Sequence, residues 1–134
     1  MSEERVELIR RTFESWNSGE REVDARDAHP EIVVRSALTN AEYHGHNGMR
    51  AWMAEIDDQF GDWHLSIDQI KDASEDRVLV LGTVHVRGRT SGVEFDQPMG
   101  WLLTFAGEQV IELRNIPSHP QALEAAGLSE GEPR

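Results

Sequence analysis

The sequence contains no cysteine, which excludes disulfide bonds, thiolate nucleophiles and cysteine-ligated zinc sites together. Positive charge is also scarce, because 13 lysines and arginines stand against 25 aspartates and glutamates, for a formal net charge of −12. An acidic protein repels phosphate backbones and anionic membrane surfaces, so we expect neither nucleic acid nor a membrane among its partners. The N-terminus lacks the apolar stretch of a signal peptide, and no apolar run approaches the length of a membrane span. We therefore expect a cytoplasmic protein.

What the sequence does contain is a succession of helical and extended patterns, within a length of 134 residues that suits one domain. Apolar residues spaced by three and four positions from Val6 to Trp16 predict a first helix, which ends at Gly19. A short polar helix is expected over 20–29, and a third helix follows the turn residues near Tyr43. A final helical turn is expected within 120–128, where a proline starts the segment and a glycine ends it.

Five extended patterns predict strands. They cover residues 31–38, 63–71, 77–89, 93–106 and 109–116. Helices that precede a run of long antiparallel strands favour an α+β fold, in which the helices pack on one face of a curved sheet. We expect a single domain over residues 1–128 and a frayed tail over 129–134.

The strand expected over 77–89 begins with apolar residues on both of its faces. Val78 and Val80 alternate with Leu79 and Leu81, so both faces of the sheet have to be covered at this point. A second copy of the chain is the simplest cover for the outer face. We therefore expect a homodimer formed through the outer face of the sheet.

Four segments resemble the SnoaL-like polyketide-cyclase family, within the nuclear-transport-factor-2-like and ketosteroid-isomerase-like superfamily. They are ESWNSGE at the end of the first helix, YHGHNGMRAWMAE, GRTSGVEF between two long strands, and LTFAGEQVIELRNIPSHPQALEAAGL, which is the most specific of the four. The similarity extends from about Val6 to Leu128. It implies a cone-shaped, curved antiparallel sheet with the N-terminal helices packed on its concave face. This fold carries isomerases, cyclases, dehydratases, epoxide hydrolases and noncatalytic modules, so the resemblance implies no single reaction.

The resemblance also implies that the catalytic residues of ketosteroid isomerases are missing. Thr12, Arg35 and Trp101 fall where those enzymes have a tyrosine, a carboxylate base and a protonated aspartic acid. An arginine does not accept a proton at neutral pH, and a tryptophan donates only from one ring nitrogen. Steroid isomerisation by that mechanism is therefore not expected.

Two other reactions of the superfamily leave a histidine and an aspartate as candidates. Thr83, His85 and Asn115 fall where limonene-type epoxide hydrolases have an arginine and two aspartates, so that mechanism is not expected either. The resemblance also implies that polyketide cyclases of this family use an aspartate as acid and base, with a histidine or asparagine nearby, and Asp96 could supply that carboxylate. Strand alternation, however, assigns Asp96 to the face opposite Trp101.

Strand alternation suggests that His85, Trp101 and Asn115 share the inner face, with Arg35 joining them from the first strand. His85 would be the general acid or base, Asn115 would orient it or bind a carbonyl, and Arg35 would neutralise an enolate or a carboxylate. The alternative is a structural histidine bonded to a backbone carbonyl or to Asn115. The residues expected to contact a ligand are Trp101, Trp52, Thr12, Phe13, Thr83, Met99 and Tyr43.

No metal or cofactor is expected, because His44 and His46 lie in a turn without an evident third ligand, and there is no glycine-rich phosphate loop. The sequence therefore favours a pocket for a small hydrophobic or carbonyl-bearing molecule. It leaves three functions open. They are cofactor-free acid–base catalysis (isomerisation, cyclisation, dehydration or hydrolysis), a noncatalytic ligand-binding or dimerisation module, and a protein-interaction module with a filled cone.

Overall fold

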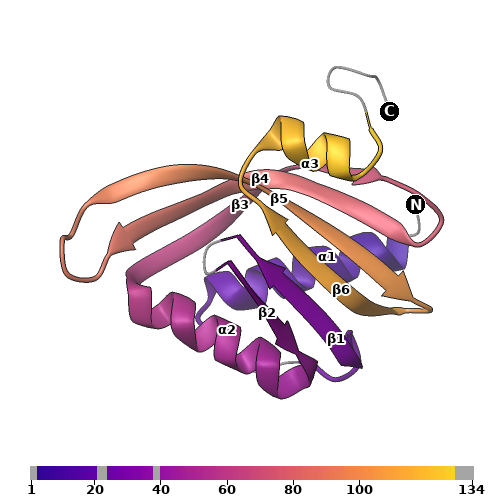
Figure 1. Cartoon of the computed structure of the whole chain (residues 1–134), viewed down its shortest axis with the longest axis horizontal. Helices are drawn as coiled ribbons and strands as arrows, with labels where there is room; N and C mark the ends of the chain where they lie inside the picture. Colours follow the sequence, from indigo (N-terminus) through magenta and orange to yellow (C-terminus); the bar gives the residue numbers. More distant parts are fainter. Residues whose placement is uncertain (1–2, 21–23, 38–39, 129–134) are drawn as a thin grey trace.

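The computed structural model describes residues 3–20, 24–37 and 40–128, which form three helices and one six-stranded sheet (Figure 1). The elements are α1 (Glu3–Asn17), β1 (Ala28–Ser36), β2 (Ala41–His44), α2 (Gly45–Gln59), β3 (Phe60–Asp72), β4 (Arg77–Gly88), β5 (Glu94–Ala106), β6 (Gln109–Ile116) and α3 (His119–Ala125). The strand order is β2-β1-β6-β5-β4-β3. The tail predicted over 129–134 lies outside the described residues.

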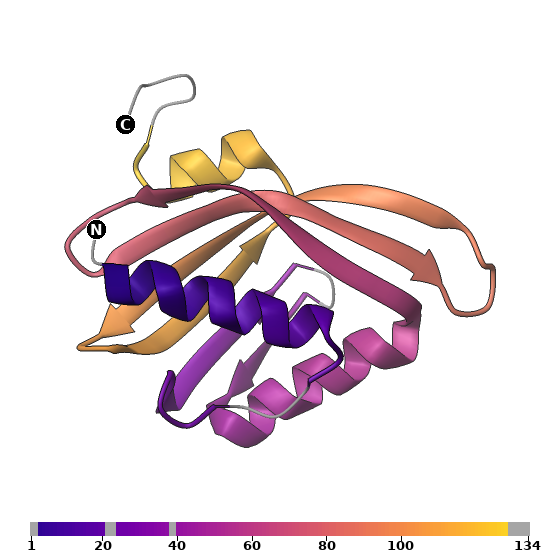
Figure 2. The ribbon, with the colours of Figure 1, turned by 180° about the vertical axis from the view of Figure 1, so that it is seen from behind.

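The predicted α+β fold with a curved sheet is confirmed. α1 and α2 lie on one side of the sheet and α3 lies on the other, as both ribbon views show (Figures 1 and 2). Neighbouring strands run antiparallel except β1 and β6, which are parallel, so the sheet is mixed rather than wholly antiparallel. None of the helices in the described ranges is long and apolar enough to cross a membrane.

The structure differs from the sequence prediction between α1 and α2. A helix was expected over 20–29, but in the described part of that segment residues 24–27 form a single turn and β1 begins at Ala28. Hydrogen bonding explains the difference, because the Ala28 N–H bonds to the Asp24 carbonyl, and Ala28 then pairs with Val110 of β6. Tyr43 and His44, which were expected in a turn, belong to β2 at the edge of the sheet.

The sheet separates two apolar cores. Even-numbered residues of β4, such as Val80 and Val84, belong to the core beneath α1 and α2. Leu79 and Leu81 point the opposite way and pack against Ala122 and other residues of α3 and its ends. α3 thus explains why both faces of β4 begin with apolar residues. It covers the outer residues, for which the sequence analysis expected a partner subunit as cover. The homodimer stays a prediction.

The contact between α3 and the sheet depends on a glycine in β5. A Cβ atom added to Gly100 would lie well inside van der Waals contact of the Ala122 methyl group. Because Ala122 is fully buried in the α3 core, it has no room to move away.

We expect Gly100→Ala to lower the free energy of unfolding by about 1 to 3 kcal/mol, the usual cost of overpacking. Chemical denaturation measures this loss. The double variant Gly100→Ala/Ala122→Gly removes the clashing methyl group, so it should recover most of the stability. A double variant no more stable than Gly100→Ala alone would contradict this account of the contact.

Candidate functional site

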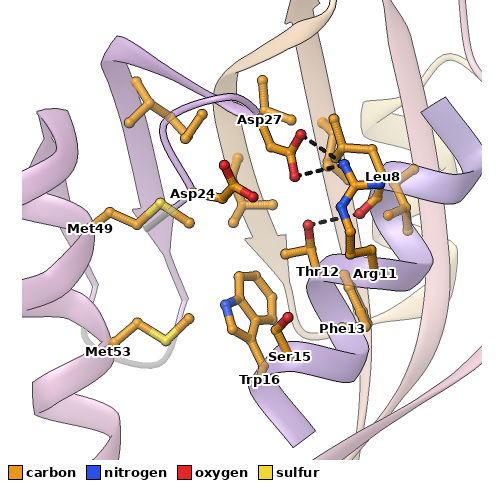
Figure 3. Close-up of a pocket in the computed structure, with 16 residues that line it drawn as sticks. Leu8, Arg11, Thr12, Phe13, Ser15, Trp16, Asp24, Asp27, Met49 and Met53 are labelled. Carbon is orange, nitrogen blue, oxygen red and sulfur yellow. Dashed lines mark hydrogen bonds and ion pairs between the residues drawn. The ribbon is translucent and has the colours of Figure 1, made fainter. Parts of the chain in front are cut away.

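The concave side of the sheet holds a cavity between α1, α2, β1 and β6, which we call the entrance cavity (Figure 3). Its volume is about 80 Å³, measured as the space that the centre of a water molecule can occupy. Its wall is mainly apolar, with side chains from both helices projecting toward the same space. The apolar lining residues are Leu8, Ile9, Phe13, Trp16, Ala28, Ile32, Met49, Met53, Leu103, Val110 and Leu113.

Polar side chains of α1 and the α1–β1 connection form one edge of the entrance cavity. The Arg11 guanidinium donates from Nη2 to Asp27 Oδ1 and Oδ2 at 2.8 and 2.9 Å. The Thr12 hydroxyl donates to the Leu8 carbonyl oxygen at 2.8 Å, so its proton is already engaged. Asp24 is held by Arg26, whose backbone N–H and guanidinium both donate to its carboxylate. This edge therefore combines fixed charges of both signs.

The hydrogen bonds from Arg26 lower the pKa of Asp24 from an ordinary value of 3.8 to about 2. The side-chain bond has the larger effect, followed by the backbone bond. Asp24 is consequently ionised at neutral pH and is a weak base there.

The concave core holds a second, smaller space, which we call the aromatic cavity. It has about 20 Å³ on the same measure, enough for one water-sized group. All four tryptophans of the chain line it, and Trp16 lines the entrance cavity as well. The Trp16 and Trp52 rings meet edge to face with centroids 5.8 Å apart, a favourable arrangement for aromatic rings.

Two buried polar atoms in the lining of the aromatic cavity have no hydrogen-bond partner among the protein residues that the structure describes. They are the Trp52 indole nitrogen Nε1, a donor, and the Asn115 side-chain oxygen Oδ1, an acceptor. The indole of Trp63, which lines the same cavity, instead donates to Asp57 Oδ1 at 2.8 Å. Because an unpartnered buried polar group costs about 1 to 3 kcal/mol, most such groups in proteins are satisfied. Trp52 and Asn115 can therefore supply a donor and an acceptor to a molecule in this cavity.

Six of the sequence-predicted site residues line these two cavities. Trp101, Trp52, Met99 and Asn115 line the aromatic cavity, and Thr12 and Phe13 line the entrance cavity. Tyr43 lines neither of the two, because its hydroxyl is turned toward Glu55 of α2 and hydrogen-bonds to that carboxylate.

The predicted inward placement of His85, Thr83 and Arg35 is wrong. β4 pairs with β5 without a register shift, and Val84 and Val86 belong to the concave core, so His85 and Thr83 between and beside them point to the outer face. The error arose because both faces of β4 begin apolar, which leaves the inward face undecided from sequence.

Arg35 is directed outward by the same alternation, since its neighbour Val34 is fully buried in the concave core. Its guanidinium pairs with Glu42 of β2 and with Glu112 of β6, the latter at 3.2 Å. These two hydrogen-bonded carboxylates raise the pKa of Arg35. Arg35 and Asn115 both border a shallow surface hollow near β2, but Arg35 does not reach either cavity.

The sequence analysis missed Arg11, Asp24 and Asp27 at the edge of the entrance cavity. The two aspartates fall in a segment that was expected to be a short polar helix, and Arg11 was not singled out. The contact between Arg11 and Asp27 joins positions 16 residues apart, which no local pattern reveals. Among the described residues, no group of three or more histidines, aspartates or glutamates is arranged to hold a metal ion.

The profile of the SnoaL-like domain matches residues 9–113, so the chain belongs to the SnoaL-like domain family. No curated protein matches it. Similar solved structures share the nuclear-transport-factor-2-like fold. An NTF2-like protein of unknown function from Burkholderia pseudomallei K96243 has 15% identity and a TM-score of 0.78, over 92% of this chain and 97% of that one.

Two further structures extend this comparison. TerC, co-crystallised with polyporic acid, has 17% identity and a TM-score of 0.75, over 92% of this chain and 98% of that one. A protein from Jannaschia sp. CCS1 assigned as a SnoaL-like polyketide cyclase has 23% identity and a TM-score of 0.74, over 97% and 94% of the two chains. At these identities the likeness establishes the fold.

The low pKa of Asp24 depends on Arg26, so we expect Arg26→Gln to raise it toward the ordinary value of 3.8. A carboxyl-detected NMR titration between pH 1.5 and 6 measures the change. Because the pKa is depressed in the folded protein, the stabilising effect of the ionised group is present above pH 3.8 and is lost as the pH falls through about 2. An Asp24 midpoint in the variant that remains near 2 would contradict the assignment.

Proposed function

We propose that the protein binds a small, mainly apolar molecule that carries a polar group, with the apolar part in the entrance cavity and the polar group in the aromatic cavity. The observation that carries the proposal is the pair of unpartnered polar atoms, Trp52 Nε1 and Asn115 Oδ1, in a space lined by aromatic rings. A hydroxyl group suits this pair, since it can accept from the indole and donate to the amide oxygen.

The composition of the two cavities supports the same chemistry. Small-molecule sites combine a mainly apolar wall with a few fixed polar groups, and the walls here follow that rule. TerC, a structure of this fold, has been co-crystallised with polyporic acid, which supports a ligand-binding role for the fold without identifying the ligand of this chain.

Acid–base catalysis is a second candidate, favoured by the position of Asp27. Its side chain is 15% exposed, lines the entrance cavity, and is oriented by two hydrogen bonds from Arg11. A carboxylate fixed in this way beside a bound molecule can accept a proton from it. As a catalyst, Asp27 would act as the general base, the role that was predicted for His85. Asp27→Asn should abolish turnover of a substrate while leaving its binding intact, which a purely structural aspartate would not do.

The ligand-binding proposal is tested by Asn115→Leu, which replaces the amide that carries the unpartnered oxygen by an apolar side chain of similar size. We expect stability to stay equal or to rise by up to about 1 kcal/mol, because an unsatisfied acceptor is removed. Affinity for phenol should fall by about 2- to 10-fold, the value of one hydrogen bond, and affinity for benzene should not change. Denaturation and isothermal titration calorimetry measure the two effects.

Asn17→Leu is the matched control for stability. The Asn17 side chain accepts from the Leu65 N–H at 2.7 Å and donates to the Leu65 carbonyl at 2.8 Å, so its loss should destabilise the protein. The proposal fails if Asn115→Leu destabilises the protein as much as Asn17→Leu does and lowers the affinity for phenol no more than the affinity for benzene. Asn115 would then have a structural role.

A further inference from the structure

The outer face of β3, β4 and β5 carries a regular array of polar side chains beyond the area that α3 covers. The pairing register places these residues in three rows across the strands. The rows are Asp62–Arg87–Glu94, His64–His85–Asp96 and Ser66–Thr83–Pro98, and all of their side chains except that of Pro98 are polar. The β4–β5 hairpin carries two residues of each row, one from each strand. It extends past α3 at the left of Figure 1.

Within this array, three side chains form a continuous hydrogen-bonded chain. His85 Nδ1 lies 2.7 Å from Asp96 Oδ1, and His85 Nε2 lies 2.8 Å from Ser66 Oγ. An ionised Asp96 can only accept, so the proton on His85 belongs on Nδ1 and leaves Nε2 free to accept the Ser66 hydroxyl proton. The order Asp–His–Ser through opposite ring nitrogens is that of a serine nucleophile with its general base.

A fourth residue fixes the plane of the His85 ring. The His64 imidazole stacks on it with centroids 4.5 Å apart and an interplanar angle of 18°. Stacking of this kind restricts rotation of the ring, so the two hydrogen bonds of His85 are held together. A nearby positive group, Arg87, is bound to Glu94 at 3.0 Å and thus does not compete for Asp96.

We propose that Ser66, His85 and Asp96 form a second catalytic site, which transfers small acyl groups from activated esters to the Ser66 hydroxyl and then to water. Ser66 Oγ attacks the ester carbonyl and passes its proton to His85 Nε2. The C–O bond to the leaving group breaks, and the leaving oxygen takes that proton. Water then attacks the acyl-serine, gives a proton to Nε2, and releases the carboxylic acid as the proton returns to Ser66.

The exposure of the site sets the class of substrate. The His85 side chain is 31% exposed and that of Asp96 is 69% exposed, and both border a shallow hollow with Asp62, His64, Arg87 and Glu94. Water reaches such a hollow, so electrostatic stabilisation of the transition state is weaker than in a closed pocket. The site is therefore suited to activated esters, whose leaving groups depart readily, and to short acyl groups that need no deep pocket.

This site is separate from the two cavities on the concave side. Ser66, His85 and Asp96 lie on the outer face, whereas their strand neighbours Leu65 and Val84 belong to the concave core. The proposal therefore stands or falls independently of ligand binding in the cone.

The test is hydrolysis of p-nitrophenyl acetate by the full chain, with mass spectrometry of peptides from the acetylated protein. We expect an acetyl group on Ser66 and no acetylation in Ser66→Ala. His85→Gln, which keeps a polar side chain but no base, should lower the rate by at least about 100-fold. Asp96→Asn should lower it as well, because an amide no longer selects the required tautomer of His85.

A control variant shows that a loss is specific. Ser18→Ala removes an exposed serine hydroxyl that donates to the Ser15 carbonyl oxygen. This variant should keep the wild-type rate and the acetyl-Ser66 peptide. Acetylation of another residue, or hydrolysis that persists in Ser66→Ala, would overturn the proposal, as would a wild-type protein that is not acetylated at Ser66.

Discussion

The alternation of side chains along β4 is the constraint on which the rest of the structure depends. Successive residues of an extended strand point to opposite faces. Because β4 pairs with β5 without a bulge, its even-numbered residues all face one side of the sheet and its odd-numbered residues all face the other. The even residues complete the core beneath α1 and α2, and the odd residues meet α3 or solvent. The tryptophan-lined cavities therefore lie on the concave side of the sheet, and the hydrogen-bonded chain of Ser66, His85 and Asp96 lies on its outer face.

The elements were predictable from sequence to the extent that their periodicity was unambiguous. α1 and the long strands follow strong patterns, and the resemblance of the segment after Val6 to SnoaL-like proteins agreed with them. The segment around Asp24 and Asp27 was misread, because its polar residues fit both an exposed helix and a turn. Only pairing of Ala28 with a strand more than 80 residues later decides between them, and such pairing is invisible to local sequence.

The candidate site was predictable only in part, for a related reason. Trp101 and Asn115 were placed on one face by strand alternation, and they do pair across β5 and β6, although the register shifts between Thr104 and Phe105. His85 was assigned to the wrong face, since leucines and valines alternate at the start of β4 and either set could have been the inner one. The helix α3, which covers Leu79 and Leu81, breaks this symmetry, and its docking position depends on the small residues Gly100 and Ala122.

The proposed binding of a ligand on the concave side depends on the Trp52 indole N–H, which has no partner among the described residues. The most direct measurement is the NMR signal of the four indole N–H groups during a phenol titration. The Trp52 signal should move downfield and saturate, whereas that of Trp63 should change little because it is already bonded to Asp57. A Trp52 signal that stays in place while phenol binds elsewhere, or equal small shifts of all four signals without saturation, would contradict the account.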